Sequence, residues 1–365
     1  MEYLIREELF NDLHWSLLLL ITAVSMAVLI KGADWLVEGA SGLALRLGMP
    51  KVIIGATIVS LGTTSPEAAV SVMAAWSGDA GLALGNAVGS IIADTALIFG
   101  VGALLVALPA DRFVLNRQGW VQFGAGVLLA VICYVAFATS GDQAVIGRTV
   151  GVVFLVLLVA YLIISVRWAR QHSQGEPFQT PEDVADGLGG IGAPSVVKFA
   201  HSLAFLICML VAGLVLVVLA SQVLINAVSE LAMQIGVSKA VIAATLVAFG
   251  TSLPELMVGI MAIRKKHGEL LVGNVIGADV LNVLFVIGAS AVASSLPLVD
   301  PETSGSMQYS FLWVQVPIML LVLVLFRIFI FRAVRCGKFA RWNGLPLVAI
   351  YVLFLILLGS MRFSS

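Results

Sequence analysis

Two copies of one short motif carry the residues best suited to bind an ion in this chain of 365 residues. Residues 60–67 read Ser-Leu-Gly-Thr-Thr-Ser-Pro-Glu, and residues 248–255 read Ala-Phe-Gly-Thr-Ser-Leu-Pro-Glu. Each copy places hydroxyls, a proline and a carboxylate inside a long apolar segment, where a carboxylate costs several kcal/mol. A group that costs so much is expected to have a function, so we interpret the two copies as halves of one cation site.

The proline of each copy is expected to break its helix. Pro66 and Pro254 lack an N–H group, and their rings clash with the carbonyl four residues back. A break at membrane depth is tolerated where the freed backbone groups find partners or line a polar cavity. The freed carbonyls near Ser60 and Ala248, the hydroxyls and the carboxylates form an oxygen-only set, which suits hard cations such as Ca²⁺ and Na⁺. The candidate ligands in these stretches are Ser60, Thr63, Thr64, Glu67, Ala248, Thr251, Ser252 and Glu255.

A second pair of matching stretches, residues 85–94 and 273–282, supplies further candidates. Ser90 and Asp94 are four residues apart and share one helix face. Asn282 occupies the register of Asp94, and Asp279 precedes it by three residues on nearly the same side. Asp94 could therefore converge with the two glutamates on one divalent ion. Asp279 is predicted to be either a fourth ligand or a hydrogen-bonding partner of one. Asn86 and Asn274 are expected to hold the backbone at the breaks rather than to touch the ion.

The composition places these motifs in a membrane. Hydrophobic residues make up 60% of the chain and charged residues 11%, against about 25% charged residues in soluble domains. The mean hydropathy is +1.07. The net charge of −1 arises from scattered charges that form no basic face, so no nucleic-acid partner is expected. The acidic opening is unlike a signal peptide, so we expect the first span to be retained.

About 20 apolar residues cross a bilayer as a helix, and this rule predicts ten spans. A polar stretch rich in Gly and Pro, residues 169–199, is predicted to be a cytoplasmic linker between five spans in residues 1–168 and five in residues 200–365. The predicted spans fall near residues 15–45, 51–76, 80–106, 119–139, 147–168, 200–231, 239–263, 268–293, 310–331 and 343–361. The first and sixth are longer than one crossing and are expected to tilt.

The two halves are repeats of one another. From residues 51–102 to residues 239–290, at an offset of 188, we count 17 identical positions in 52 without a gap. Because five is odd, the second copy must be inverted, which is typical of secondary transporters with a site near the midplane. Lys and Arg concentrate on the loops that are inside if the N-terminus is outside. The predicted fold is therefore an all-α polytopic membrane protein with ten transmembrane helices, two inverted five-helix repeats and both termini outside.

The paired motifs resemble the two repeats of the sodium/calcium exchanger family within the calcium:cation antiporters, in a bacterial type without a large regulatory loop. The resemblance implies that Glu67 and Glu255 are shared among the ion positions and that Thr63 and Thr251 complete a calcium position. It implies sodium ligands at Ser60, Ala248, Thr64 and Ser252, with Asp94 and Asn282 closing the middle. Many members have Asn in the first copy and Asp in the second, the reverse of this chain. This swap of Asn and Asp leaves open which ion each position prefers. The additional acid Asp279 raises the prospect of potassium or proton coupling.

The predicted function is exchange of Ca²⁺ for a monovalent cation, with Na⁺ favoured, in a multi-pass membrane protein that is not an enzyme and needs no cofactor. Inorganic cations and membrane lipid are the expected partners. One alternative is a transporter of the same fold that is coupled to H⁺ or K⁺ or that carries Mn²⁺. An intramembrane acid hydrolase and a channel are less favoured. Lys31, Asp34 and Glu38 are expected to pair within the first span, or to mark a helix that slides. The basic cluster at residues 264–267 is expected to set topology.

Overall fold

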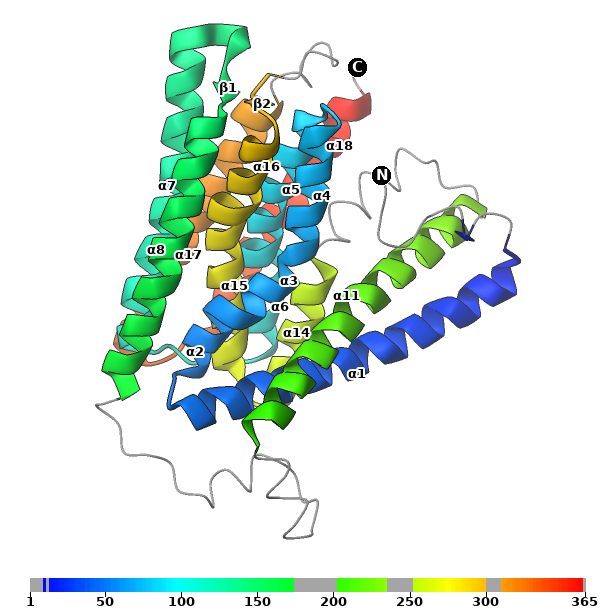
Figure 1. Cartoon of the computed structure of the whole chain (residues 1–365), viewed down its shortest axis with the longest axis vertical. Coiled ribbons are helices and arrows are strands. Elements are labelled where there is room, and N and C mark those ends of the chain that lie inside the picture. The colour runs from blue at the N-terminus through cyan, green and yellow to red at the C-terminus, as the bar shows by residue number, and fades with distance from the viewer. Residues whose placement is uncertain (1–8, 11–12, 174–201, 235–251, 300–309, 364–365) are drawn as a thin grey trace.

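The computed structural model describes residues 9–10, 13–173, 202–234, 252–299 and 310–363, and these form a bundle of long helices (Figure 1). Several of the helices are interrupted by π-helical turns, named η here. The first half comprises α1 (Trp15–Leu47), α2 (Lys51–Ile54), η2 (Gly55–Val59), α3 (Ser60–Thr63), α4 (Ser65–Trp76), α5 (Ala80–Ile92), η3 (Ala93–Ile98), α6 (Phe99–Leu105), α7 (Arg112–Ser140) and α8 (Arg148–Ser173). The second half comprises α11 (Leu203–Gln234), α14 (Leu253–Arg264), α15 (Gly268–Leu281), η6 (Asn282–Ile287), α16 (Gly288–Ala293), η8 (Phe311–Gln315), α17 (Val316–Cys336) and α18 (Gly344–Phe363).

Two helical rods form the centre of the bundle. In the most apolar window of residues 268–293, 94% of the residues are buried, and in that of residues 80–105 the share is 72%. The other long helices have far lower shares because one side of each faces outward. Figure 1 shows the rod of α15 and α16 between α8 on one side and α3 and α4 on the other, with α7 and α8 running together along one side. The site predicted from the sequence lies on these central elements.

The helices α1 and α11 lie side by side and cross the rest of the bundle diagonally (Figure 1). Glycines let their backbones touch. A Cβ atom added to Gly39 would lie 2.7 Å from the backbone nitrogen of Leu210, and one added to Gly213 would lie 2.5 Å from that of Leu36. With 33 and 32 residues, both exceed the ~20 that a crossing needs. The prediction that both helices are longer than one crossing is confirmed, and their tilt in the membrane stays a prediction.

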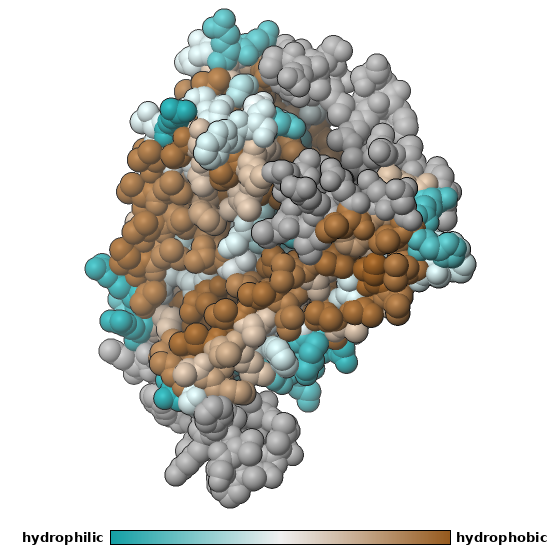
Figure 2. Space-filling model, turned by 45° about the vertical axis from the view of Figure 1, so that its right-hand side comes forward, coloured by the Kyte–Doolittle hydropathy of each residue, from teal (hydrophilic) through white to brown (hydrophobic). Residues whose placement is uncertain are grey.

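The outer surface suits a lipid environment. Among the described residues, eight helices are long and apolar enough to span a membrane. Figure 2 shows a broad hydrophobic surface on one face of the molecule, with most of the strongly hydrophilic residues around its margins. The predicted span at residues 51–76 is not among the eight because it is divided into α2, η2, α3 and α4. Residues 239–251 of the seventh predicted span lie outside the described residues, and the rest of that span is α14.

The helix boundaries repeat at the offset of the sequence motifs. The helix α11 begins 188 residues after α1, and α14 begins and ends 188 residues after α4. In both halves a π-helical turn, η3 or η6, interrupts the central rod within one residue of the same register. π-Helical turns are rare and are frequent at functional sites. The repeat found in the sequence therefore extends to the irregular parts of the backbone.

Two features differ from the prediction. Within the described ranges, the paired strands are β1 (Val145–Ile146) and β2 (Leu296–Pro297), which form one short antiparallel pair. This pair closes the turn between α7 and α8 against the chain that follows α16. The helix α8 continues to Ser173, beyond the predicted end at residue 168. The apolar pattern stops before the helix does, because the last turn of α8 is polar, with Arg170 and Gln171.

Candidate ion-binding site

The proline motif interrupts the second predicted span as expected. The helix α3 ends at Thr63 and α4 begins at Ser65, with Pro66 in its first turn. The interruption is local, because Thr64 is the single residue between the two helices. Its backbone has φ −81° and ψ −4°. The carbonyl of Ser60 was expected to be freed, but it accepts a hydrogen bond from the Thr64 N–H at 2.8 Å. Ser252, before α14, has a similar backbone conformation at φ −85° and ψ 8°.

Glu67 follows the interruption and lies inside the protein, with 1% of its surface exposed. Its carboxylate is close enough to those of Glu255 and Asp94 to be repelled by both. The side chain of Asn86 donates to the backbone carbonyl of Glu67 at 3.3 Å and to the hydroxyl of Ser71 at 2.9 Å. The prediction that Asn86 holds the backbone at the break is confirmed.

Glu255 belongs to the second copy but meets residues of the first. It is as buried as Glu67, and the hydroxyls of Thr63 and Thr64 lie beside its carboxyl group. The Thr63 hydroxyl also donates to the backbone carbonyl of Ser60 and to the side-chain oxygen of Asn274, each at 3.4 Å. Asn274 thus contacts a candidate ligand through its side chain, and within the described residues it holds no backbone group. The two motifs form one constellation, as the sequence predicted.

Asp94 joins this constellation from the central rod. It lies in the π-helical turn η3, it is repelled by Glu255 and by Asp279, and the hydroxyl of Ser252 lies beside it. That hydroxyl also donates to the hydroxyl of Ser90 at 3.3 Å. Residues separated by 162 positions in the chain therefore meet at the same place.

Several oxygens of this constellation make no hydrogen bond with the described residues. Buried polar atoms are normally paired, and each such orphan calls for an explanation. No partner among the described residues reaches Oε2 of Glu67, either carboxylate oxygen of Glu255 or Asp94, Oδ1 of Asp279, Oδ1 of Asn282 or the hydroxyl of Thr64. Cations are the natural partners of such oxygens, because an unpaired buried carboxylate is costly.

The described residues hold no group of three or more His, Cys, Asp or Glu side chains arranged closely enough to bind a metal ion by themselves. The oxygens available to complete a coordination shell here are the hydroxyls of Thr63, Thr64, Ser90 and Ser252, the side-chain amide of Asn282 and backbone carbonyls. These are the oxygen types that hard cations accept alongside carboxylates.

Within the described residues, only one of the two carboxylate oxygens of Asp279 accepts hydrogen bonds. Its Oδ2 accepts a hydrogen bond from the Thr95 hydroxyl at 2.5 Å and another from the Gln122 amide at 2.6 Å. Gln122 also donates to the Thr95 hydroxyl at 3.3 Å. Three elements, η3, α7 and α15, therefore meet at this carboxylate. Neither Thr95 nor Gln122 was identified from the sequence, although Gln122 is a polar residue in an apolar helix and Thr95 adjoins a predicted ligand.

Close contact between the repeats makes the site possible. A Cβ atom on Gly277 would lie 2.4 Å from the carbonyl oxygen of Ala56 and 2.5 Å from the hydroxyl of Ser60. One on Gly273 would lie 2.1 Å from the carbonyl oxygen of Val52. The rod α15 therefore lies directly on η2 and α2, and only glycine permits this distance. Of the predicted ligands, Ala248 and Thr251 lie outside the described residues.

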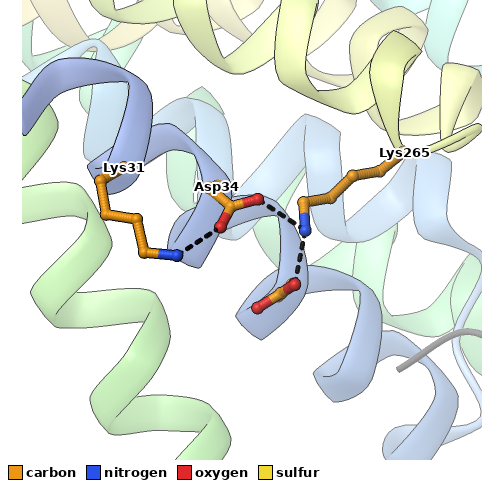
Figure 3. Close-up of polar contacts among 4 residues, drawn as sticks. Lys31, Asp34 and Lys265 are labelled. Carbon is orange, nitrogen blue, oxygen red and sulfur yellow. Dashed lines mark hydrogen bonds and ion pairs between the residues drawn. The ribbon is translucent and has the colours of Figure 1, made fainter. Parts of the chain in front are cut away.

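Ion pairs join α1 to the C-terminal end of α14 (Figure 3). The ammonium of Lys265 lies 2.6 Å from Oδ1 of Asp34 and 2.5 Å from Oε1 of Glu38. Lys31 lies 2.9 Å from Oδ2 of Asp34. The pairing expected within the first span is present between Lys31 and Asp34. The contact to Lys265 was missed because the sequence does not show that residues 227 positions apart are adjacent.

Comparison with known proteins gives consistent results. A family model described as sodium/calcium exchanger protein matches residues 17–167 and 205–359. The putative antiporter CaxA of Alkalimonas amylolytica is 31% identical over 320 residues, which cover 88% of this chain and 91% of that protein. The sodium/calcium exchanger MaX1 of Methanosarcina acetivorans is 30% identical over 354 residues, covering 93% and 97%.

The fold matches solved structures of the sodium-calcium exchanger NCX_Mj. The form soaked without Na⁺ and Ca²⁺ superposes with a TM-score of 0.73 at 26% identity, covering 94% of this chain and all of that one. The form soaked with 2.5 mM Na⁺ and 10 mM Sr²⁺ gives a TM-score of 0.72 at 25% identity, covering 93% and 98%. The similarity therefore extends over both repeats.

Proposed function

Because the chain belongs to the sodium/calcium exchanger family, whose members are multi-pass membrane antiporters and not enzymes, we propose that it exchanges Ca²⁺ for Na⁺ by alternating access. The relatives named as sodium/calcium exchangers support this choice of ions. The observation that carries the proposal is the set of buried carboxylates from both repeats, several of whose oxygens have no hydrogen-bond donor among the described residues.

The physical basis of exchange is mutual exclusion at shared acids. Two unit charges 4 Å apart interact with about 4 kcal/mol at an effective dielectric of 20, so empty carboxylates strongly favour a cation load. One Ca²⁺ or several Na⁺ can neutralise the same acids, but the two loads compete for the same oxygens. If the bound ions do not neutralise the acids, the protein is less able to switch the site from one side of the membrane to the other. Exchange of one load for the other follows.

We assign ligand roles as the resemblance implies. Glu67 and Glu255 are shared by the Ca²⁺ and Na⁺ positions, and Asp94 lies between the repeats. Hydroxyls, carbonyls and an amide complete the shells. The proposed ligands are Ser60, Thr63, Thr64, Glu67, Ser90, Asp94, Ala248, Thr251, Ser252, Glu255, Asp279 and Asn282.

We also propose the topology that the repeat requires. Residues 1–168 and 200–365 are two inverted five-span units, residues 169–199 are a cytoplasmic linker, and both termini are outside. The broken segment at residues 51–76 and its counterpart at residues 239–263 are the two spans beyond the eight long ones. The long pair α1 and α11 moves across the remaining helices to expose the site on alternate sides.

The test is Ca²⁺ uptake into proteoliposomes that contain the purified protein. With Na⁺ inside and none outside, we expect rapid uptake of radioactive Ca²⁺, and little uptake when choline replaces Na⁺. Glu67→Gln and Glu255→Gln should each abolish uptake, because each removes a shared charge while preserving the side-chain shape. Normal uptake by either variant would contradict the assignment, and uptake without any counter-ion would indicate a channel.

Coupling to K⁺ or H⁺ is the second candidate, and Asp279 is the observation that favours it. This fourth buried acid adds a charge that a Na⁺/Ca²⁺ site built from three acids does not need. Uptake driven by a K⁺ gradient alone, or by a pH gradient alone, would identify this alternative.

A further inference from the structure

We propose that Tyr161 of α8 is a positioning residue for the ion site. Its hydroxyl stabilises the π-helical turn η2, and this turn sets the face on which the next helix, α3, presents Ser60 and Thr63. The inference rests on the proposed exchange of Ca²⁺ for Na⁺. It assigns a role to a buried hydroxyl that lies outside both repeated stretches.

The backbone of η2 directs one N–H group away from its α-helical acceptor. In an α-helix the N–H of Ser60 would donate to the carbonyl four residues back, that of Ala56. In this turn it donates to the carbonyls of Gly55 and Thr57 instead. A buried carbonyl needs a donor, and the hydroxyl of Tyr161 donates to that of Ala56 at 3.1 Å. The tyrosine hydroxyl therefore replaces the donor that an α-helix would supply.

The same arrangement recurs at a second π-helical turn, η8. The N–H of Val316 donates to the carbonyl of Phe311 rather than to that of Leu312, its α-helical acceptor. The hydroxyl of Tyr134, on α7, donates to the Leu312 carbonyl at 2.9 Å. In both turns the tyrosine binds the carbonyl of the second residue. The recurrence supports a role for the hydroxyl in stabilising the π form.

The π form of η2 decides which way α3 faces. A π-helical turn contains one residue more than the register of an α-helix allows. Removing this extra residue from the register would rotate the following helix by about 100° and shift it by about 1.5 Å. Ser60 begins α3 and Thr63 ends it. Such a rotation would turn Thr63 away from Asn274 of α15, whose side-chain oxygen accepts a hydrogen bond from the Thr63 hydroxyl at 3.4 Å.

The surroundings of η2 leave α3 as the part that responds. A Cβ atom on Gly55 would lie 2.7 Å from the carbonyl oxygen of Leu270, so η2 lies directly on α15. The helix that carries Tyr161 is held in turn against α16, because a Cβ atom on Gly151 would lie 2.7 Å from the carbonyl oxygen of Gly288. With η2 fixed between α15 and α8, a change of its register must appear in α3 and its candidate ligands.

The experiment compares ion affinity in two conservative variants. Tyr161→Phe removes the hydroxyl at η2. Tyr134→Phe is the matched control, because it removes the same kind of bond at η8, which holds no proposed ligand. We expect Tyr161→Phe to raise the Ca²⁺ dissociation constant in calorimetry about fivefold, as for the loss of one hydrogen bond. The half-saturating Ca²⁺ concentration in transport should rise by the same factor with the maximal rate nearly unchanged. Tyr134→Phe should alter neither constant.

A double-variant cycle shows whether Tyr161 acts through α3. Thr63→Ala removes a proposed ligand from α3 and should weaken Ca²⁺ binding. Combined with Tyr161→Phe, it should weaken binding by less than the product of the two single effects, because both changes act on the same ligand. Ser252→Ala removes a proposed ligand of the other repeat, so its combination with Tyr161→Phe should give the full product. A general loss of stability would not distinguish these two pairs.

The outcomes separate the role of Tyr161 from the proposed function. If the wild type neither binds nor transports Ca²⁺, the proposed function fails. Hydrogen exchange then still tests η2, because residues 55–63 should exchange faster in Tyr161→Phe and not in Tyr134→Phe. Wild-type Ca²⁺ affinity in Tyr161→Phe, or an equal loss of affinity in Tyr134→Phe, would overturn the positioning role. Failure of Tyr161→Phe to fold would overturn it as well, because a positioning bond should not decide whether the chain folds.

Discussion

Asp94 and Asn282 occupy the same register of the two repeats, yet only Asp94 has an ionisable side chain. Asp94 is repelled by Glu255, an acid of the other repeat, so its charge acts across the repeat interface. If the site has pseudo-two-fold symmetry, the charge should function from either register. The residue types can then be exchanged without losing the site.

This symmetry can be tested by moving the charge. We expect Asp94→Asn to lower Na⁺-dependent Ca²⁺ uptake by at least tenfold, because one acid of the site is lost. The double change Asp94→Asn with Asn282→Asp should recover uptake to within about threefold of wild type, since neighbouring sites couple strongly. An additive loss in the double variant would show that the two positions do not face a common ion.

At the scale of elements, the contact between α15 and η2 depends on Gly277, which has no side chain to separate the two backbones. Gly277→Ala would bring a Cβ atom 2.4 Å from the Ala56 carbonyl oxygen, and overpacking of this kind costs about 1–3 kcal/mol. We expect a lower melting temperature and weaker Ca²⁺ uptake. Gly124→Ala on α7, where no atom lies within 4 Å, should be neutral. Equal stability of the two variants would contradict the close contact.

The link between α1 and α14 is a second feature at this scale. Burial alone would lower the pKa of Lys265, but hydrogen bonds to Asp34 and Glu38 outweigh it and raise the pKa above its ordinary value. The stabilisation is present below the ordinary lysine pKa and is lost only as the pH rises through the higher folded value. The pairs therefore persist at physiological pH and hold α1 against the rest of the bundle.

Removing this link should loosen α1. Lys265→Met and Glu38→Gln should each destabilise the described conformation by about 1 kcal/mol, as expected for a partly exposed ion pair. Together they should cost less than the sum, because they remove the same contact. Hydrogen exchange in α1 reports the effect, and Lys266→Met, which removes a charge from the exposed neighbour, should not change it. Additive effects would show that Lys265 and Glu38 do not interact.

The loop between α14 and α15 should be sensitive to acid. Burial and the nearby charges of Lys51 and Lys265 lower the pKa of His267 from 6.5 to about 4. The neutral ring nitrogen Nδ1 lies 3.1 Å from the Lys51 ammonium, which can donate to it.

An unfolded histidine takes up a proton near pH 6.5, whereas the folded His267 does so only near pH 4. Stability should therefore fall as the pH drops from about 6.5 toward 4. We expect the melting temperature of the wild type to decrease more between pH 7 and pH 5 than that of His267→Gln. Identical decreases would show that His267 does not titrate in this way.

At the scale of the whole molecule, the repeat explains what the sequence could predict. The offset of 188 identifies Glu67 and Glu255 as counterparts, and α4 and α14 keep that offset in the structure. The apolar runs predict the long helices because lipid requires complete backbone hydrogen bonding within each one. A broken span such as residues 51–76 is also visible in the sequence, because Pro66 stands within it.

Contacts between helices distant in the chain were not predictable in this way. Gln122 meets Asp279 across 157 residues, and Lys265 meets Glu38 across 227 residues. The repeat does not reveal them, because neither pair has a charged counterpart in the other half. Single-sequence patterns show which face of a helix is apolar, but they do not show which polar residue of another helix will meet it.

The central claim is that the acids of both repeats bind one Ca²⁺. Calorimetric titration of the purified protein with Ca²⁺ in Na⁺-free buffer tests this most directly. We predict one Ca²⁺ bound per chain, competed by Na⁺, and lost in both Glu67→Gln and Glu255→Gln. If one of the two variants binds Ca²⁺ as the wild type does, the two repeats do not share the ion and the claim is wrong.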